Sequence, residues 1–379
     1  MTRGAVRLLW RDAGATSGFR AGVSLHSHTM HSRESLGFLP DFVDRVPMLG
    51  SEVRRLVSRY EAKTGKRADF STAYWTPPLP GREAYQLERR QVEHLGLAAF
   101  VSLTDHDNIE AGTQLQLVDQ RAPISVEWTV PFETTYFHIG VHNLPPSQAH
   151  DWMADLAGYT SRPAVPLLLQ LLQSLDAEPG VLLVLNHPLW DQAGIGAGAH
   201  RGALVNLLVT AGRWIHALEL NGLRPWAENQ KTVAMARELN RTLAGGGDRH
   251  GLEPNSIINL TGAATFEEYV HQVRAGSNHV LFLPQYRDPP GLRVLQTVCD
   301  VMSNYPDLAG REQWAARIFY SDGGRILPLN SAWKNGGPRV AQWFARAAQI
   351  GASRRVRRLL RLWRDEDREF ALPLAEAQD

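Results

Sequence analysis

The chain has 379 residues, of which 44% are hydrophobic and 21% charged, a composition that excludes a largely disordered protein. Lys and Arg number 40 and Asp and Glu 39, so no net charge points to nucleic acid or a membrane surface as the main partner. The single cysteine, Cys299, excludes an internal disulfide framework and a thiolate zinc cage, which leaves histidines and carboxylates as metal ligands.

Short apolar runs that end in polar residues alternate with stretches of helical periodicity, a pattern that predicts an α/β fold with a parallel barrel or sheet. The runs end at His26-Ser-His28, Thr104-Asp105-His106, Val126-Glu127, His138 to His142, Asn186-His187-Pro188, Glu219-Leu-Asn221 and Gly247-Asp248-Arg249-His250. The predicted helices cover 83–95, 166–175, 202–211, 227–239 and 266–275. In such folds, functional groups gather at the carboxyl ends of the strands.

Two regions depart from this alternation. Residues 41–80 are long for a connection between strands, so we interpret them as an insertion with a helix over 51–63 and a turn-rich stretch around Trp75. That stretch either packs against the barrel or forms a wall of the substrate site. Residues 286–379 form an appendage of unknown role, whose arginine-rich part, 354–364, we expect to be a solvated or partner-facing helix.

The termini and apolar segments bear on localisation. The first residues lack an apolar run long enough for a signal peptide, and no later stretch approaches a membrane span. We therefore expect a cytoplasmic protein without membrane contact. The sequence leaves its oligomeric state open.

His26 and His28 flank Ser27 at the end of an apolar run, and strand alternation directs both imidazoles to the same side, where they can chelate one metal. A lone His-x-His is weak evidence for a metal site. The other strand ends strengthen it, because several of them carry histidine or carboxylate. At one of these ends, the glycines before Asp248 allow close backbone approach.

These motifs resemble those of the PHP (polymerase and histidinol phosphatase) domain, a family of metal-dependent phosphoesterases. The matching elements, in the family's order and within residues 22–285, are HSHTMHSRES, SLTDHD, the glutamate of SVEW, FHIG, LNHP, LELN and GGDRH. The resemblance implies a distorted seven-stranded (β/α) barrel with two or three divalent metal ions at its mouth. Mixed imidazole and carboxylate ligands favour manganese, zinc or iron over magnesium or calcium.

The resemblance also implies which residues bind each metal. One site would use His26, His28, Glu127 and Asp248, with Glu127 bridging to a second site that is completed by His138 and His187. A third site would use Glu34, His106 and His250. His142 competes with His138, because alternation places both on one face of a strand, and His138 is preferred.

Two positions depart from the family's pattern. Ser24 stands where the family commonly has an aspartate, and Ser32-Arg33-Glu34 replaces its usual Ser-Asp. The first change removes support for His26 but no ligand. The second change affects the third site.

Further residues near the proposed ligands have expected roles. Arg33 and Arg249 either contact substrate phosphate or form salt bridges, and Asp105 either orients a ligand histidine or moves a proton. His250 is expected to take part in catalysis as well. Glu219 and Asn221 are interpreted as support for the ligands.

The expected reaction is hydrolysis of a phosphoester by a metal-activated hydroxide. The substrate would be a small phosphomonoester, a nucleotide or an oligonucleotide end, and binding of longer nucleic acid is not favoured. One alternative is an amidohydrolase-like enzyme that cleaves carbon–nitrogen bonds, although its commonest form uses a bridging lysine that no strand end supplies here. The other alternative is a non-catalytic metal-binding or regulatory module.

Overall fold

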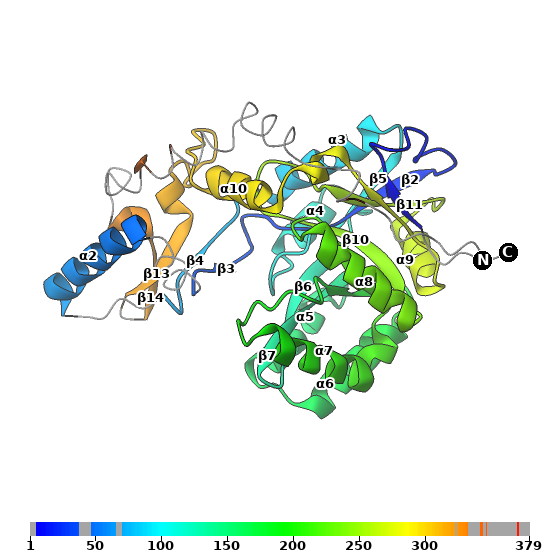
Figure 1. The fold of residues 1–379 in the computed structure, drawn as a ribbon, viewed down its shortest axis with the longest axis horizontal. Helices are drawn as coiled ribbons and strands as arrows, with labels where there is room; N and C mark the ends of the chain where they lie inside the picture. Colours follow the sequence, from blue (N-terminus) through cyan, green and yellow to red (C-terminus); the bar gives the residue numbers. More distant parts are fainter. Residues whose placement is uncertain are drawn as a thin grey trace.

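The computed structural model describes residues 5–37, 47–65, 70–322 and 324–332, together with residues 342, 343, 346 and 370. Over these residues the protein is a mixed α/β structure with a large, mostly parallel sheet, a smaller four-stranded sheet and helices packed around them (Figure 1). No helix among them combines the length and the apolar character needed to cross a membrane.

The larger sheet has the strand order β1-β12-β11-β2-β10-β9-β8-β7-β6, with β5 paired to β2. Neighbours β5, β2, β10, β9 and β8 run parallel, whereas β7 is antiparallel to both β6 and β8, and β11 is antiparallel to β2 and β12. The strands are β1 (Val6–Leu8), β2 (Ala21–Ser27), β5 (Ala98–Val101), β6 (Ile124–Phe132), β7 (Thr135–Leu144), β8 (Leu182–Asn186), β9 (Ala217–Asn221), β10 (Thr242–Arg249), β11 (Ile257–Thr261) and β12 (His279–Phe282).

The two sides of this sheet approach each other next to the proposed ligands. Beyond β5 the chain reaches Asp105, whose carbonyl accepts a hydrogen bond from the Glu127 amide of β6 at 3.2 Å. The Asp107 amide donates to the Glu127 carbonyl at 3.0 Å, and His106 forms a parallel bridge with Glu127. The sheet therefore curls into a barrel-like arrangement. The predicted parallel arrangement is found for β5, β2, β10, β9 and β8, whereas β7 and β11 run antiparallel to their neighbours.

The helices lie where the apolar periodicity predicts them. The five predicted helices are confirmed as α3 (Gly81–His94), α6 (Val165–Ala177), α7 (Ala197–Ala211), α8 (Trp226–Glu238) and α9 (Phe266–Arg274). Three further helices are α4 (Glu110–Gln116), α5 (Ala149–Ser161) and α10 (Pro290–Val301). Apolar side chains of α5, α6 and α7 pack with those of β6, β7 and β8 in the largest core cluster.

The smaller sheet joins two regions that are far apart in the sequence. Its strand order is β14-β13-β4-β3, with β3 (Glu34–Ser35) and β4 (Tyr74–Trp75) near the N-terminus and β13 (Ile318–Asp322) and β14 (Arg325–Pro328) near the C-terminus. The helix expected over 51–63 is confirmed as α2 (Pro47–Thr64). It lies beside this sheet, away from the barrel-like body (Figure 1). The expected arginine-rich helix, 354–364, lies outside the described residues.

Candidate metal centre

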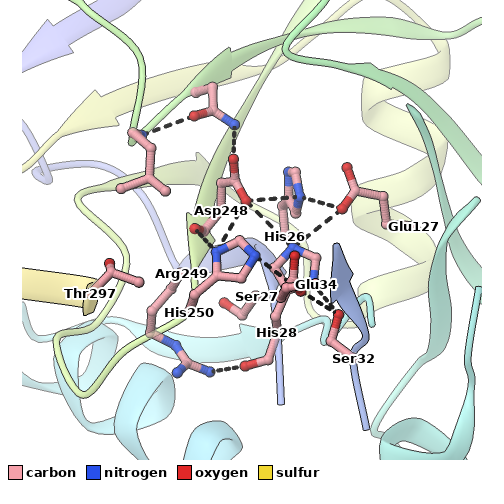
Figure 2. A network of polar contacts seen from close by, with 12 residues as sticks. His26, Ser27, His28, Ser32, Glu34, Glu127, Asp248, Arg249, His250 and Thr297 are labelled. Carbon is pink, nitrogen blue, oxygen red and sulfur yellow. Dashed lines mark hydrogen bonds and ion pairs between the residues drawn. The ribbon is translucent and has the colours of Figure 1, made fainter. Parts of the chain in front are cut away.

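The centre begins at the end of β2, where His26 and His28 point to the same side with ring centroids 5.1 Å apart. Their Nε2 atoms lie 3.0 and 3.2 Å from Glu127 Oε2 and 3.6 and 3.4 Å from Asp248 Oδ1 (Figure 2). All four side chains are at most 4% exposed. Strands β2, β6 and β10 thus bring two imidazoles and two carboxylates together.

Glu127 occupies the middle of the cluster. Its Oε2 atom faces His26 and His28, while its Oε1 atom lies 3.2 Å from His138 Nδ1 and 3.1 Å from His187 Nε2. The two oxygens therefore face different sets of histidines. This is the arrangement needed for a carboxylate that bridges two metals.

Glu34 lies on another side of His28. Its carboxylate oxygens are 3.2 Å from His250 Nε2 and 3.3 Å from His106 Nε2, and His28 Nδ1 lies 3.7 Å from the nearer oxygen. The rings of His28 and His250 stack with centroids 4.1 Å apart. The structure thus brings together the three residues that the resemblance implied for a third site, and adds His28 to them.

Four groups of candidate ligands have donor atoms within 4.8 Å of one another. They divide the residues differently from the family pattern, since His187 groups with His26 and Asp248, and His138 groups with His106 and Glu127. The four groups are His28-Glu34-His106-His250, His26-His28-Glu127, His26-His187-Asp248 and His106-Glu127-His138. Together they contain all nine residues expected to bind metal.

Several atoms of the cluster are buried without a hydrogen-bond partner. They are His26 Nε2, His28 Nε2, Glu127 Oε2 and His138 Nδ1. Buried polar atoms without partners cost free energy, on the order of 1–3 kcal/mol each, unless something binds them. Metal coordination would satisfy all four, so the residues present fit a group of divalent cations.

The backbone at three candidate ligands is left-handed. His26, His187 and Asp248 have φ angles of 61°, 27° and 57°. A non-glycine residue in this region costs about 1–3 kcal/mol, and such residues concentrate at functional sites. Their positions at the ends of β2, β8 and β10 turn the side chains toward the cluster.

Three ligand histidines have one ring nitrogen fixed by an acceptor. His26 Nδ1 lies 2.5 Å from Glu219 Oε1, and His250 Nδ1 lies 2.8 Å from the Asp248 carbonyl. His28 Nδ1 lies 3.1 Å from Ser32 Oγ, whose own proton goes to Glu34. With Nδ1 held in this way, each Nε2 is directed at the cluster and can offer its lone pair to a cation, as an imidazole ligand requires.

Glu219 of β9 connects two ligand-bearing strands. Besides contacting His26, its carboxylate accepts a hydrogen bond from the His187 amide at 2.8 Å and one from Asn221 Nδ2 at 2.9 Å. Gly246 allows this close approach, because a Cβ there would lie 1.7 Å from Glu219 Oε1. Glu219 and Asn221 thus hold the ligands in place, in the supporting role that the sequence suggested.

In the metal-free protein, opposite charges shift the pKa values inside the cluster. Burial alone would lower the pKa of His106, but Glu34 and Glu127 outweigh it and raise that pKa to about 10. Burial raises the pKa of Glu127, while the neighbouring His26, His106 and His138 lower it well below its usual value. The carboxylates are therefore ionised and available to cations.

The direction of β7 separates His138 from His142. Because β7 is antiparallel to β8, His138 pairs with Asn186 at the ligand-bearing end, whereas His142 pairs with Leu182 at the opposite end. His142 Nδ1 instead lies 2.8 Å from Ser102 Oγ, and His142 is absent from the four ligand groups. Alternation alone places both histidines on one face, so strand direction makes the distinction.

Arg249 does not face the cluster. Its guanidinium donates to Glu88 Oε1 at 2.9 Å and to the carbonyls of Gly251 and His28 at 2.7 and 3.0 Å, and the residue is 4% exposed. The expected phosphate contact is therefore replaced by the salt bridge that was its alternative. Buried Glu88 gave no signal in the sequence beyond its place on an amphipathic helix.

A polar network lies beneath the metal ligands. Glu88 also accepts hydrogen bonds from Ser24 Oγ and from the amide of Asn255, and the Asn255 side chain donates to Ser24, to Ser27 and to the Leu25 carbonyl. Ser24, at the position of the family's aspartate, thus binds Glu88. The network fixes the strand that carries His26 and His28.

The side chains of Asp105 and Arg33 lie beside the ligands, where they contact Thr29 and Tyr74, respectively. Asp105 accepts hydrogen bonds from the amide and the hydroxyl of Thr29, at 2.5 and 2.7 Å, and so holds the turn after His28. Arg33 is exposed, with its guanidinium 5.3 Å from the centre of the Tyr74 ring. Only Arg33 of the two expected arginines is therefore open to solvent.

Aromatic side chains contact three of the ligand histidines. Trp75 lies 5.7 Å from His250, Tyr136 lies 5.5 Å from His138, and Trp190 lies 5.1 Å from His187, as ring centroids. All three aromatic residues are partly exposed. Trp75, and with it the insertion, therefore packs next to the cluster.

Comparisons with known proteins give only distant likenesses. No family model and no curated protein matches the chain. PsfC from Pseudomonas syringae has 14% identity and a TM-score of 0.40, covering 74% of this chain and 97% of its own. A protein from Bifidobacterium adolescentis, provisionally assigned as a metal-dependent phosphoesterase, has 14% identity and a TM-score of 0.33, covering 53% of this chain and 92% of its own.

Proposed function

We propose that this protein is a metal-dependent phosphoesterase built on a distorted seven-stranded barrel of PHP type. The observation that carries the proposal is the buried cluster, in which nine histidines and carboxylates converge and four of their polar atoms lack partners. The order of the motifs along the chain supports the phosphoester class. The substrate would be a small phosphomonoester, a nucleotide or an oligonucleotide end.

The residues divide into proposed metal positions that share ligands. Glu127 would bridge, because its two oxygens face different histidines. Two or three manganese, zinc or iron ions would be held by His26, His28, Glu34, His106, Glu127, His138, His187, Asp248 and His250. When bound, such ions lower the pKa of water to about 7 and neutralise charge on phosphoryl oxygens.

The protein's own groups prepare the site for this chemistry. Glu219 holds His26 through Nδ1, and Ser32 holds His28 through Nδ1, so that the Nε2 atoms of both rings are directed at the cluster. Asp105 fixes the turn after His28 through Thr29. Arg33, exposed and adjacent to Glu34, is the arginine we propose to meet the substrate phosphate.

The commonest form of the carbon–nitrogen hydrolase alternative uses a bridging lysine. Lys231 is exposed on α8, so it does not reach the buried cluster. Lys66, Lys334 and the side chain of Lys63 lie outside the described residues. The residue at the centre of the cluster is a carboxylate, Glu127, and this supports the phosphoesterase proposal.

The test is phosphate release from a panel of phosphomonoesters, nucleotides and 3′- or 5′-phosphorylated oligonucleotides, with protein loaded with manganese, zinc or iron. Turnover of at least one class, abolished by Asp248→Ala and kept by His94→Ala, is the expected result. His94 is a suitable control because it is an exposed histidine at the end of α3. Absence of turnover with every metal would overturn the proposal.

A further inference from the structure

Glu34 differs from the other candidate ligands in how the fold holds it. It lies on the two-residue strand β3, which belongs to the smaller sheet and, among the described residues, pairs with β4 in the register Glu34 to Trp75. The Leu36 amide adds a hydrogen bond to the Ala73 carbonyl at 2.9 Å. The position of the Glu34 carboxylate therefore depends on β4.

Strand β4 is held in turn by residues 301–322, which we call the C-terminal segment. Ile318 of β13 pairs with Trp75, and the Thr76 amide donates to the Arg317 carbonyl at 2.9 Å. The rings of Tyr74 and Phe319 stack with centroids 4.8 Å apart. The C-terminal segment thus supplies the second edge of the strand that holds Glu34.

Arg311 of this segment binds both the loop before β3 and the residue after β4. Its Nη1 atom donates to the Met30 carbonyl at 3.1 Å and to Thr76 Oγ1 at 3.0 Å. Met30 lies four residues before Glu34, and Thr76 follows β4 directly. One guanidinium therefore fixes both the loop that leads to Glu34 and the strand that pairs with it.

Arg317 fixes the C-terminal segment itself. Its fully buried guanidinium donates to the Arg311 carbonyl at 2.8 Å and to the Val301 carbonyl at 2.6 Å, and it also contacts the Ser303 carbonyl. Several backbone carbonyls are thus gathered around one side chain. These hydrogen bonds fix the backbone of the segment that carries Arg311.

We infer that Arg311 is a positioning residue for the third metal position, the one formed by Glu34, His106, His250 and His28. The inference rests on the proposed metal centre and goes beyond it, because it assigns completion of that position to the C-terminal segment, outside the barrel. The other positions use ligands from β2, β6, β7, β8 and β10 and their ends, together with His106 beyond β5, and none of these elements is bonded by Arg311.

The experiment measures bound manganese per chain, by elemental analysis after titration and dialysis, in the full-length protein. Arg311→Ala is compared with Glu34→Ala, with the double variant and with Arg274→Ala. Arg274 is a matched control because its partly buried guanidinium also binds backbone carbonyls, those of Glu178 and Val181. These residues precede the first residue of β8, and the candidate ligand His187 follows its last residue. Arg311→Lys tests whether one retained donor restores binding.

Arg311→Ala is expected to weaken the most weakly bound manganese about 10–100-fold, the range seen when support of a ligand is removed. The double variant should lose no more metal than Glu34→Ala, Arg311→Lys should recover part of the affinity, and Arg274→Ala should bind like the wild type. Full metal binding by Arg311→Ala, or equal loss in Arg274→Ala, would overturn the inference.

Two further measurements keep the result interpretable. If Arg311→Ala unfolds, Thr76→Val removes only one of its hydrogen bonds and should weaken the same metal in a folded protein; unchanged metal binding there would contradict the inference. A wild-type protein that binds no manganese would instead contradict the proposed metal centre. Because metal content is read without a substrate, failure of the phosphoesterase assay leaves the inference on Arg311 unaffected.

Discussion

His26 Nδ1 and Glu219 Oε1 lie 2.5 Å apart in the buried interior, where both side chains are 1% exposed. The carboxylate accepts a hydrogen bond from His26 Nδ1, and Nε2 faces Glu127 and Asp248. Burial lowers the pKa of His26, but Glu127, Glu219 and Asp248 outweigh it and raise that pKa well above its usual value. Cations and protons therefore compete for the same nitrogen.

Glu219→Gln should weaken metal binding about 10–100-fold, because it replaces one of the two acceptor oxygens that serve His26 and the His187 amide. Isothermal titration calorimetry with zinc or manganese measures the change in metal affinity. Glu93→Gln, in the exposed Arg89–Glu93 pair, is the control and should bind like the wild type. Equal affinities for the two variants would contradict the role given to Glu219.

His138→Ala and His142→Ala should differ in metal content, although the two histidines lie on the same strand face. His138→Ala removes a nitrogen 3.2 Å from Glu127 Oε1, whereas His142 contacts Ser102. We expect His138→Ala to lower the metal bound per chain and His142→Ala to leave it unchanged. Elemental analysis decides, and loss of metal only in His142→Ala would reverse the assignment.

The sequence predicted the parts of the fold that local patterns determine. The five predicted helices are confirmed, and the helical periodicity of apolar residues is clearest in α3 and α9. The candidate ligands converge, because strand ends in such folds meet at one side. Periodicity carries no information on strand direction, however, so the antiparallel course of β7, which distinguishes His138 from His142, was not predictable.

Contacts between residues far apart in the chain could not be predicted from the sequence either. Glu88 and Arg249 are separated by 161 positions, and no local pattern pairs them. The pairing of Trp75 with Ile318 likewise joins an insertion and an appendage that looked like separate additions. Arg249 next to a ligand looked like a phosphate-binding residue, since adjacency in sequence does not reveal which way a side chain points.

Arg249→Met should lower the free energy of unfolding by about 3–5 kcal/mol, because it leaves Glu88 buried without its charged partner. Urea denaturation of the metal-free protein measures the change. Arg33→Met, at an exposed position, should change it by less than about 0.5 kcal/mol. Similar values for the two variants would contradict a buried structural ion pair.

His216 predicts a pH dependence of stability outside the metal centre. It accepts a hydrogen bond from the Leu183 amide at 2.9 Å and donates to Asp176 at 2.8 Å, and burial lowers its pKa to about 4. A histidine with a depressed folded-state pKa contributes stability that is present above its unfolded pKa near 6.5 and is lost as pH falls toward 4.

Between pH 7 and pH 5 the titration of His216 should lower the free energy of unfolding of the wild type by about 2 kcal/mol, since one unit of pKa shift corresponds to about 1.4 kcal/mol. His216→Gln removes the titration and should show a smaller loss over the same interval, as measured by urea unfolding at both pH values. His94→Gln, at an exposed histidine, should behave like the wild type. The same loss in all three proteins would exclude His216 as the cause.

The most direct test of the buried metal centre is anomalous X-ray diffraction from crystals of protein saturated with zinc or manganese. We predict two or three anomalous peaks within the cluster, with zinc about 2.0–2.2 Å from nitrogens such as His26 Nε2 and oxygens such as Glu127 Oε2. A saturated crystal without peaks at these residues, or with peaks only elsewhere on the protein, would contradict the account.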